Sequence, residues 1–339
     1  MMATGTTSSF GGFADPGLYG RETLSARSYG KALFALAEVD ERIVCLGADL
    51  TQPTETGLMR DKLPDRFVML GIAEANMIGV AAGMAKCGDI PFTHTFCVFA
   101  TRRCYDQVAM QVAYPRANVK IVGFMPGLTT PLGVSHQAID DVALMRALPG
   151  MTIVEPSGPE QIDAAVRAVA AWDGPVYLRL QIASRQIDET VPLRGLTIGK
   201  GEVLRQGADI AIITAGVTLP AALRAADLLG PEASATVVNM HTLKPLDEQL
   251  VLELARSHRA ILTLENHSTV GGLGSAVAEV LALGDQKPRF GMIGVPDQFA
   301  EGGSLPFLLA KFGLDAESVA ARARALLGLN TDNKNGPDS

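Results

Sequence analysis

Short apolar segments typical of buried β-strands alternate with longer amphipathic segments along most of the chain. The apolar segments lie at residues 42–47, 66–71, 119–124, 151–155 and 175–180. The segments around them have the apolar spacing expected of α-helices, at residues 25–39, 74–86, 101–113, 140–148 and 159–172. A strand that is apolar on both faces must be covered on both faces. The alternation therefore predicts an α/β fold on a mostly parallel sheet with helices on both faces.

The alternation stops once and then resumes. Residues 183–207 contain turn residues and no long helical pattern. A second series follows, with strands expected at 209–215, 235–240 and 260–265 and helices at 218–229, 247–257 and 274–283. A chain of 339 residues has room for about two domains. We therefore expect a tail at 1–20, a first domain at 21–190, a second domain of similar construction at 191–328 and a tail at 329–339.

Composition, charge and motifs exclude several classes of protein. The net charge is −7 and no basic stripe stands out, which argues against nucleic-acid binding. The sequence has neither an apolar run of membrane-spanning length nor a signal peptide, so a soluble cytoplasmic protein is expected. The four cysteines form no C-x-x-C pair and are expected to be buried thiols, and the five histidines are scattered, so no metal site is expected. P-loop, nucleophile-elbow and zinc-protease motifs are absent.

Polar and aromatic side chains at the ends of the expected strands are candidate site residues. Glu74 follows one strand and begins a helix, the position at which open α/β sheets bind ligands, although a helix-start acid favoured by the helix dipole has the same pattern. Phe96 and Phe99 follow another strand, where aromatic residues are often core. His136 lies in a loop rich in Gly, Pro and Thr, and Asp49 ends a further strand. Together these positions indicate a ligand site more strongly than any one of them.

Several motifs carry a family resemblance. The order GIAEANM, TFCVFATRRCYDQ and SHQAIDDVALMRALPGMTIVEP resembles the pyrimidine-binding domain of transketolases. TLKPLDEQL and LENHSTVGGLGSAV resemble the transketolase C-terminal domain, and the resemblance extends from about residue 21 to about residue 326. It implies a thiamine-diphosphate-dependent enzyme that transfers a two-carbon ketol unit from a ketose donor to an aldehyde or another acceptor.

The resemblance also implies roles for individual residues. The acid that matches Glu74 hydrogen-bonds N1′ of the aminopyrimidine and favours the imino tautomer that removes the thiazolium proton. A carboxyl group in apolar surroundings is expected to have a raised pKa, which suits that proton sharing. Phe96 and Phe99 match the aromatic residues that cradle the pyrimidine.

Three further positions follow from the same resemblance. His136 matches the histidine that touches the donor hydroxyl groups. Asp49 falls where the family has a cofactor-side acid at the dimer interface. Arg102, within TFCVFATRRCYDQ, is also expected to bind the cofactor.

The expected substrate contacts depart from the family pattern. The phosphate-binding positions of common transketolases fall on Ala26, Pro53, Phe124 and Ile182, and an acid that reads a donor hydroxyl falls on Leu132. An apolar lining of Phe124, Leu132 and Ile182 suits an acceptor with less charge than a sugar phosphate. His94, where the family has a small hydroxyl residue, is a further substrate candidate. The arginines that could compensate are Arg27, Arg179 and Arg185.

The chain lacks one motif that transketolase chemistry requires. Full-length transketolases have a GDG motif that binds Mg²⁺ and the diphosphate, and no GDG occurs in these 339 residues. The resemblance therefore implies the C-terminal subunit of a split transketolase, active only with an N-terminal subunit that holds Mg²⁺ or Ca²⁺, in an α2β2 heterotetramer. Two alternatives remain open: the β subunit of a 2-oxo-acid dehydrogenase E1 component, and a non-catalytic regulatory subunit.

Overall fold

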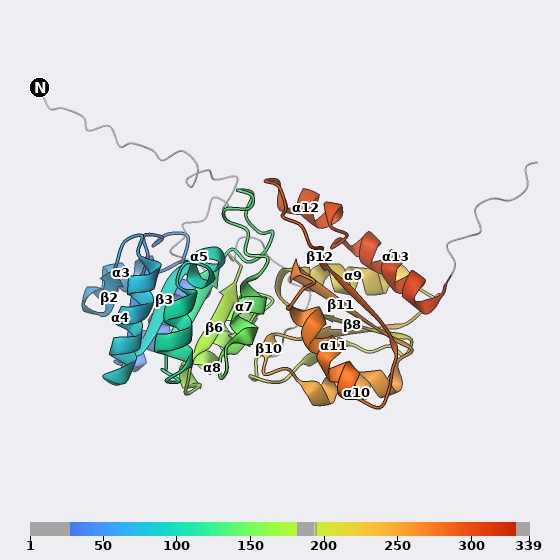
Figure 1. Ribbon diagram of the computed structural model, residues 1–339, viewed down its shortest axis with the longest axis horizontal. Helices are drawn as coiled ribbons and strands as arrows, with labels where there is room; N and C mark the ends of the chain where they lie inside the picture. Colours follow the sequence, from blue (N-terminus) through green and yellow to red (C-terminus); the bar gives the residue numbers. More distant parts are fainter. Residues whose placement is uncertain (1–27, 182–192, 194, 330–339) are drawn as a thin grey trace, which may run out of the picture.

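The computed structural model describes residues 28–181, 193 and 195–329, and it contains two sheets side by side (Figure 1). The expected boundaries at residues 20 and 190 lie outside the described residues. The fold predicted from the sequence, two mostly parallel sheets flanked by helices, is confirmed. Among the described residues no helix is both long enough and apolar enough to cross a membrane.

The first sheet has seven strands in the order β10-β5-β6-β4-β3-β1-β2. All neighbours are parallel except β10, which pairs antiparallel with β5. The strands are β1 Ile43–Gly47, β2 Phe67–Met69, β3 Ile90–Phe96, β4 Lys120–Phe124, β5 Thr152–Val154, β6 Val176–Leu180 and β10 Thr242–Lys244. The accompanying helices are α2 Ser28–Val39, α3 Gly57–Lys62, η2 Pro64–Arg66, α4 Glu74–Lys86, α5 Cys97–Thr101, α6 Tyr105–Gln107, η3 Val108–Ala113, α7 Asp141–Ala147 and α8 Pro159–Ala171.

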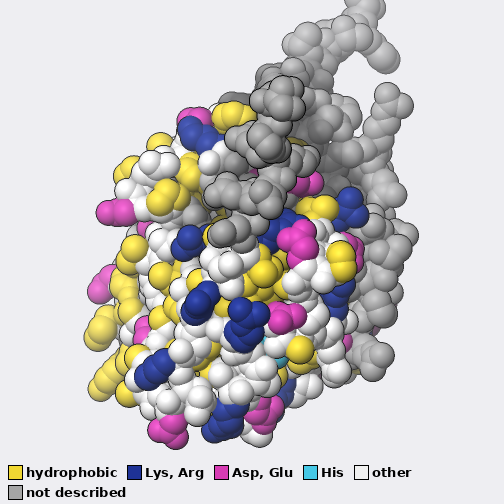
Figure 2. Space-filling model, turned by 90° about the vertical axis from the view of Figure 1, so that its right-hand side faces the viewer, with side chains coloured by type: hydrophobic (Ala, Val, Ile, Leu, Met, Phe, Trp, Pro, Cys, Tyr) yellow, Lys and Arg dark blue, Asp and Glu magenta, His cyan; other side chains and the backbone are white. Residues whose placement is uncertain are grey.

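The second sheet has five strands in the order β12-β11-β8-β9-β7. Only β7 is antiparallel to its neighbour. The strands are β7 Glu202–Arg205, β8 Ile210–Thr214, β9 Ala235–Asn239, β11 Ala260–Ser268 and β12 Arg289–Val295. The helices are η4 Gly216–Thr218, α9 Leu219–Leu229, α10 Glu248–Ser257, α11 Leu273–Leu283, α12 Leu305–Lys311 and α13 Ala316–Leu327. Figure 2 shows one face of the molecule, on which described acidic and basic side chains are interspersed.

Three sequence expectations differ from the structure. The helix expected at 101–113 is divided into α5, a turn at 102–104, α6 and a single π-helical segment, η3. In addition, β10 comes from the C-terminal half of the chain but completes the first sheet, so the two sheets do not divide the sequence cleanly. A third expectation fails at one position, because Cys87 is exposed while the other three cysteines are buried.

Among the described residues, the buried apolar side chains form two clusters, and the larger one extends across both halves. The larger cluster of buried side chains joins residues beneath the first sheet to residues on β8, β11, α10 and α11 of the second. Polar contacts cross the same boundary: Asn266 Nδ2 donates to the Pro126 carbonyl, and its Oδ1 accepts from Leu128 N. Gly127 has φ +51°, and an added Cβ would lie 2.2 Å from the Asn266 carbonyl oxygen, so this close approach requires glycine.

Candidate active site

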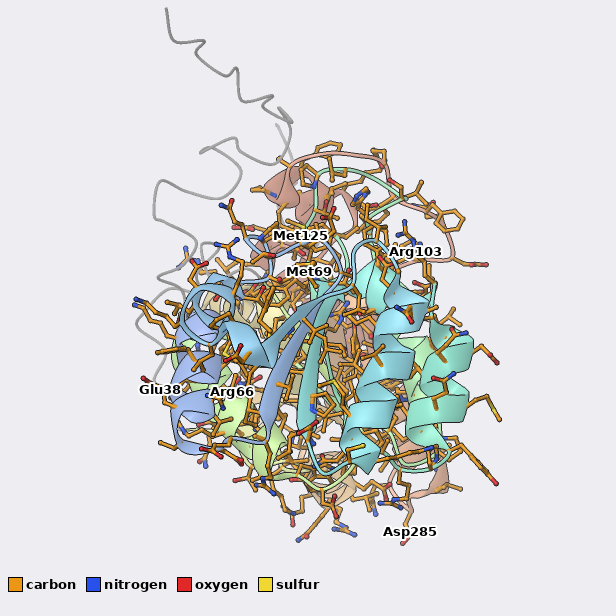
Figure 3. All side chains as sticks on the ribbon, turned by 90° about the vertical axis from the view of Figure 1, so that its left-hand side faces the viewer. Glu38, Arg66, Met69, Arg103, Met125 and Asp285 are labelled. Atoms are coloured by element: carbon orange, nitrogen blue, oxygen red, sulfur yellow. The ribbon has the colours of Figure 1, made fainter. Side chains whose placement is uncertain are left out.

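The carboxyl edge of the first sheet gathers the predicted site residues. Glu74 begins α4 shortly after β2, Phe96 ends β3 and Phe99 lies one turn into α5. His136 lies in the loop after β4, the next strand in the sheet. Figure 3 shows Arg103 at the same end of the domain as Met69 and Met125, which lie at the ends of β2 and β4. Carboxyl ends of parallel strands are where open α/β sheets form ligand sites.

Glu74 is an almost buried carboxyl group. Its side chain is 5% exposed, and Arg103 Nη1 donates to its Oε1 at 3.1 Å. The position at the first turn of α4 places the carboxylate near unpaired backbone N–H groups, which favour a negative charge. Both readings of this acid, helix-start residue and site residue, are therefore physically compatible.

Three rings pack together beside Glu74. Phe96 and Phe99 stack with centroids 6.0 Å apart and planes inclined by 27°. The ring of His136 meets Phe99 edge-on at 5.3 Å and Phe96 at 6.3 Å. The guanidinium carbon of Arg103 lies 3.9 Å from the centroid of Phe99. The structure thus brings Glu74, both phenylalanines and His136 into one cluster.

The loop that carries His136 is held from both domains. Ser135 Oγ and His136 Nδ1 are 2.9 Å apart, and Gln137 Nε2 donates to the Glu301 carbonyl at 3.1 Å. The Gly303 N–H donates to the Pro131 carbonyl, so the segment before α12 supports this loop, as Figure 1 shows. Burial and then the charge of Arg103 lower the pKa of His136. At neutral pH the imidazole is therefore uncharged and offers one donor and one acceptor.

The arginine at the cluster is not the one expected from the sequence. The guanidinium of Arg102 forms a bidentate pair with Asp140, at 2.8 and 2.9 Å, and also donates to the Gln137 carbonyl. Arg103 instead reaches Glu74 and Phe99. Both arginines belong to the motif TFCVFATRRCYDQ. A continuous helix was expected at 101–113, whereas a turn at 102–104 points the Arg102 and Arg103 side chains in different directions.

Asp49 and Leu132 lie at the surface. Asp49 follows β1 with φ +64°, and its N–H donates to Met69 Sδ at 3.2 Å. Its side chain is exposed at the carboxyl edge of the sheet. Leu132 is 44% exposed in the His136 loop. Both side chains are accessible to a ligand or a partner, whereas neither contacts Glu74 within the described contacts.

Two other substrate candidates are core residues. His94 is fully buried, with Nε2 2.6 Å from Tyr29 Oη and Nδ1 2.9 Å from the Leu46 carbonyl. Burial lowers its pKa to about 4, so it is a neutral structural histidine. Phe124 is also fully buried and packs edge-on against Tyr29 at 5.3 Å. Neither side chain reaches the surface, so the structure gives the predicted substrate contacts of His94 and Phe124 no support.

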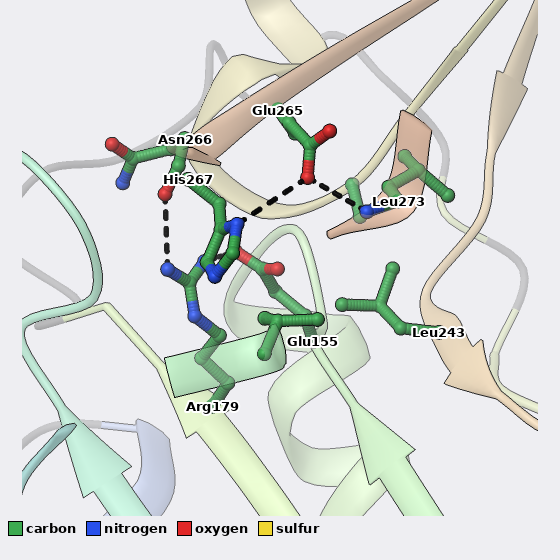
Figure 4. Close-up of a pocket in the computed structure, with 9 residues that line it drawn as sticks. Glu155, Arg179, Leu243, Glu265, Asn266, His267 and Leu273 are labelled. Atoms are coloured by element: carbon green, nitrogen blue, oxygen red, sulfur yellow. Dashed lines mark hydrogen bonds and ion pairs between the residues drawn. The ribbon is translucent and has the colours of Figure 1, made fainter. Parts of the chain in front are cut away.

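Arg179 is likewise unavailable to a substrate phosphate. It is buried, and it donates to Asp141 and the Ala138 carbonyl. It also donates to Glu155 and the Asn266 carbonyl, as Figure 4 shows. The adjoining cavity measures about 10 Å³, room for roughly one water molecule. The suggestion that Arg179 replaces a missing phosphate ligand is therefore wrong. Pro53 is half-buried, and Ala26, Arg27, Ile182 and Arg185 lie outside the described residues.

Glu265, a residue of β11, also lines this cavity, and its carboxyl group meets the start of α11. Its carboxyl oxygens accept from Leu273 N at 2.7 Å and Gly274 N at 2.8 Å. Burial nevertheless raises its pKa to about 7. His267 Nδ1 lies 3.8 Å from the Glu265 carboxyl group, and burial lowers the pKa of that imidazole. Near neutral pH the imidazole is therefore uncharged and Glu265 is partly protonated.

The cluster around Glu74 fits an aminopyrimidine ring. Arg103 presents a flat, N–H-donating group that stacks on Phe99 and donates to Glu74. An aminopyrimidine held by the same two residues would use the same face and the same acceptor. Among the described residues, no group of three or more His, Cys, Asp or Glu is placed to hold a metal ion. The residues present therefore fit the pyrimidine end of thiamine diphosphate.

Family comparisons agree with this geometry. The family described as "Transketolase, pyrimidine binding domain" matches residues 24–184, and "Transketolase, C-terminal domain" matches residues 199–319. The chain belongs to the transketolase family. Within that family it is a transketolase-like subunit, as its similarity to proteins of comparable length indicates.

Three relatives define this similarity. A 6-deoxy-6-sulfo-D-fructose transketolase subunit from Clostridium sp. (strain MSTE9) is 44% identical, over 91% of this chain and 94% of the relative. A solved structure described as a split gene transketolase, inactive beta4 tetramer, is 42% identical with a TM-score of 0.82, covering 90% of this chain and 98% of that chain. The 1-deoxy-D-xylulose-5-phosphate synthase of Symbiobacterium thermophilum is 37% identical over 88% of this chain and 46% of the synthase.

Proposed function

We propose that this chain is the pyrimidine-binding subunit of a two-component transketolase. The carrying observation is the nearly buried Glu74 carboxyl group beside the stacked rings of Phe96 and Phe99. When bound there, thiamine diphosphate supplies the carbon nucleophile that cleaves a ketose donor. Glu74 holds a proton at the ring nitrogen N1′, the two phenylalanines orient the ring, and His136 binds a donor hydroxyl group.

We propose that a second subunit completes the site. The diphosphate and its Mg²⁺ or Ca²⁺ need oxygen ligands, which a GDG-containing N-terminal subunit supplies. Two observations support this: the chain contains no GDG, and a similar split-gene transketolase was found as an inactive β4 tetramer. Asp49 and Leu132 are exposed at the edge where such a partner meets the site. The active assembly is an α2β2 heterotetramer in the cytoplasm.

The ketose is proposed to be a specialised one. Leu132 is exposed in the same loop as His136, at the position where the family pattern places an acid that reads a donor hydroxyl. A relative 44% identical over 91% of the chain acts on 6-deoxy-6-sulfo-D-fructose. We therefore propose a donor or acceptor other than the ordinary pentose phosphates, with sulfonated ketoses as the first compounds to test.

Reconstitution tests the reaction and its substrate together. The chain is combined with a GDG-containing subunit, thiamine diphosphate and Mg²⁺, and is given either xylulose 5-phosphate with ribose 5-phosphate or 6-deoxy-6-sulfofructose with an aldehyde acceptor. Ketol transfer in the complex, and none with either subunit alone, is expected. Rapid turnover of the two pentose phosphates overturns the specialised substrate, and activity of the isolated chain overturns the partner requirement.

Glu74→Gln tests the assigned acid. The amide keeps the size of the side chain but not its proton-sharing carboxyl group, so kcat in the reconstituted complex is expected to fall by about 100-fold or more. Glu38→Gln is the matched control, because Glu38 is exposed and lies on the opposite flank of the first domain from Arg103 (Figure 3). Equal rates for the two variants would remove Glu74 from the proposed mechanism.

A further inference from the structure

The Arg103 side chain covers the surface that an aminopyrimidine ring must use. Its guanidinium carbon lies 3.9 Å from the centroid of the Phe99 ring, and Nη1 donates to Glu74 Oε1 at 3.1 Å. The rest of the Phe99 ring is already in contact, because Phe96 stacks against it at 6.0 Å and His136 meets it edge-on at 5.3 Å. Phe96 is buried, so the guanidinium lies over the accessible side of the stacked Phe96 and Phe99 rings.

One face of a phenyl ring has room for a single flat partner at stacking distance. A second ring cannot stack on Phe99 while the guanidinium lies 3.9 Å above it. Arg103 also donates to Oε1 of Glu74, so a ring that hydrogen-bonds that oxygen competes with the guanidinium there as well. Any aromatic ligand that uses both contacts must therefore displace Arg103 from both.

Arg103 is held loosely enough to be displaced. Its side chain is 48% exposed, and its hydrogen-bond partner among the described residues is Glu74. Partly exposed ion pairs and single cation–π contacts are individually weak. The neighbouring Arg102 differs, because Asp140 and the Gln137 carbonyl hold its guanidinium with several hydrogen bonds.

We propose that Arg103 is a gate at the pyrimidine site. In the absence of the cofactor it covers Phe99 and pairs with Glu74, and it moves off both when the ring binds. This inference rests on the proposed function. It assigns Arg103 a positioning role at the site, because the guanidinium must leave the Phe99 ring before another ring can stack there, and because it competes with that ring for Glu74 Oε1.

The gate predicts an unusual sign for a charge-removing substitution. Thiamine diphosphate is an anion, so a cation that acted only by attraction would make Arg103→Ala slow its association. A gate predicts the reverse: if the closed form is populated for roughly nine-tenths of the time, removal of the guanidinium strengthens apparent affinity roughly tenfold. Arg103→Lys keeps the charge but not the flat group, and is expected to lie between the wild type and Arg103→Ala.

The experiment measures binding rather than turnover. The reconstituted complex is titrated with thiamine diphosphate in Mg²⁺ by calorimetry, and association is followed by stopped-flow fluorescence. Arg60→Ala is the control, because Arg60 is 49% exposed and is likewise ion-paired, with Asp61. Faster and tighter binding by Arg103→Ala, with Arg60→Ala unchanged, supports the gate.

Two other results are distinguishable. If the wild-type complex binds thiamine diphosphate and Arg103→Ala binds equally well or more weakly, the gate is overturned and the proposed function stands. If neither the wild-type complex nor Arg103→Ala binds, the proposed function fails and the gate fails with it.

Discussion

Arg179 carries its positive charge in the interior of the protein, between the two sheets. Its guanidinium donates to Asp141 at 2.8 Å and to Glu155 at 2.7 Å, and Tyr177 Oη adds a bond to Asp141. The same guanidinium reaches the Asn266 carbonyl on β11. Arg179 therefore joins the two domains, and the cluster proposed to bind the cofactor lies elsewhere, around Glu74.

Arg179→Met is expected to destabilise the protein strongly. The substitution leaves Asp141 and Glu155 buried without their cation, which costs about 3–5 kcal/mol of the free energy of unfolding. Urea unfolding at pH 7 measures this loss. Arg205→Met is the control, since the Arg205–Asp227 pair is 38% and 58% exposed and its loss costs about 1 kcal/mol or less. Similar losses for both variants would contradict the structural role of the buried pair.

At the scale of the element, the first turn of α11 is hydrogen-bonded to a carboxyl group. Glu265 accepts from the N–H groups of Leu273 and Gly274 in the first turn of the helix. An added Cβ on Gly272 would lie 1.9 Å from Glu265 Oε2, so the backbone must approach the acid without a side chain. Burial raises the pKa of this group to about 7 although two N–H groups favour its charged form. The helix start is therefore coupled to protonation of Glu265.

This coupling predicts how stability depends on pH. The pKa of Glu265 is about 7 in the folded protein against an ordinary value of 4.5, so folding favours the protonated form. Its contribution is fully present below about pH 4.5 and is lost as the pH rises through 7, on the order of 3 kcal/mol in all.

Glu265→Gln isolates that contribution. The amide does not titrate, so the unfolding free energy of the variant relative to the wild type is expected to rise between pH 5 and pH 8. The lost helix-start hydrogen bond adds a constant offset, because a Gln oxygen and its NH₂ group cannot both accept. Urea unfolding at several pH values measures the difference, and a pH-independent difference would contradict the raised pKa.

At the scale of the whole molecule, the two sheets are expected to unfold together. One buried apolar cluster includes residues of both, and β10 from the second half of the chain completes the first sheet. Trp172 is the one tryptophan and ends the helix α8 of the first sheet. Its fluorescence reports that half, whereas far-ultraviolet circular dichroism reports the helices and strands of both.

The two signals are expected to change at the same urea concentration. Cooperative units unfold in one transition when their cores are continuous. Leu243→Ala, which removes a buried side chain of β10, should move both transitions to lower urea by the same amount. A fluorescence transition separated from the dichroism transition would show that the halves are independent.

Local pattern alone was enough to predict much of the fold and part of the site. Continuous apolar strands must be covered on both faces, so the parallel α/β class followed from the sequence. The helix beginning at Glu74 was predicted with the observed bounds because its periodicity is local. The motif order, which requires no coordinates, also indicated the family that the comparisons show.

Contacts between distant segments decided the remainder. His94 is buried against Tyr29, 65 positions earlier, and Arg179 is ion-paired with Asp141 and Glu155. Because of the turn at 102–104, Arg103 rather than Arg102 points toward Glu74. The sequence by itself determined the order of elements and the chemical types at the strand ends, because these depend on neighbouring residues. Only the tertiary structure decided which side chains are accessible and which are paired, because burial and hydrogen bonding depend on segments brought together by folding.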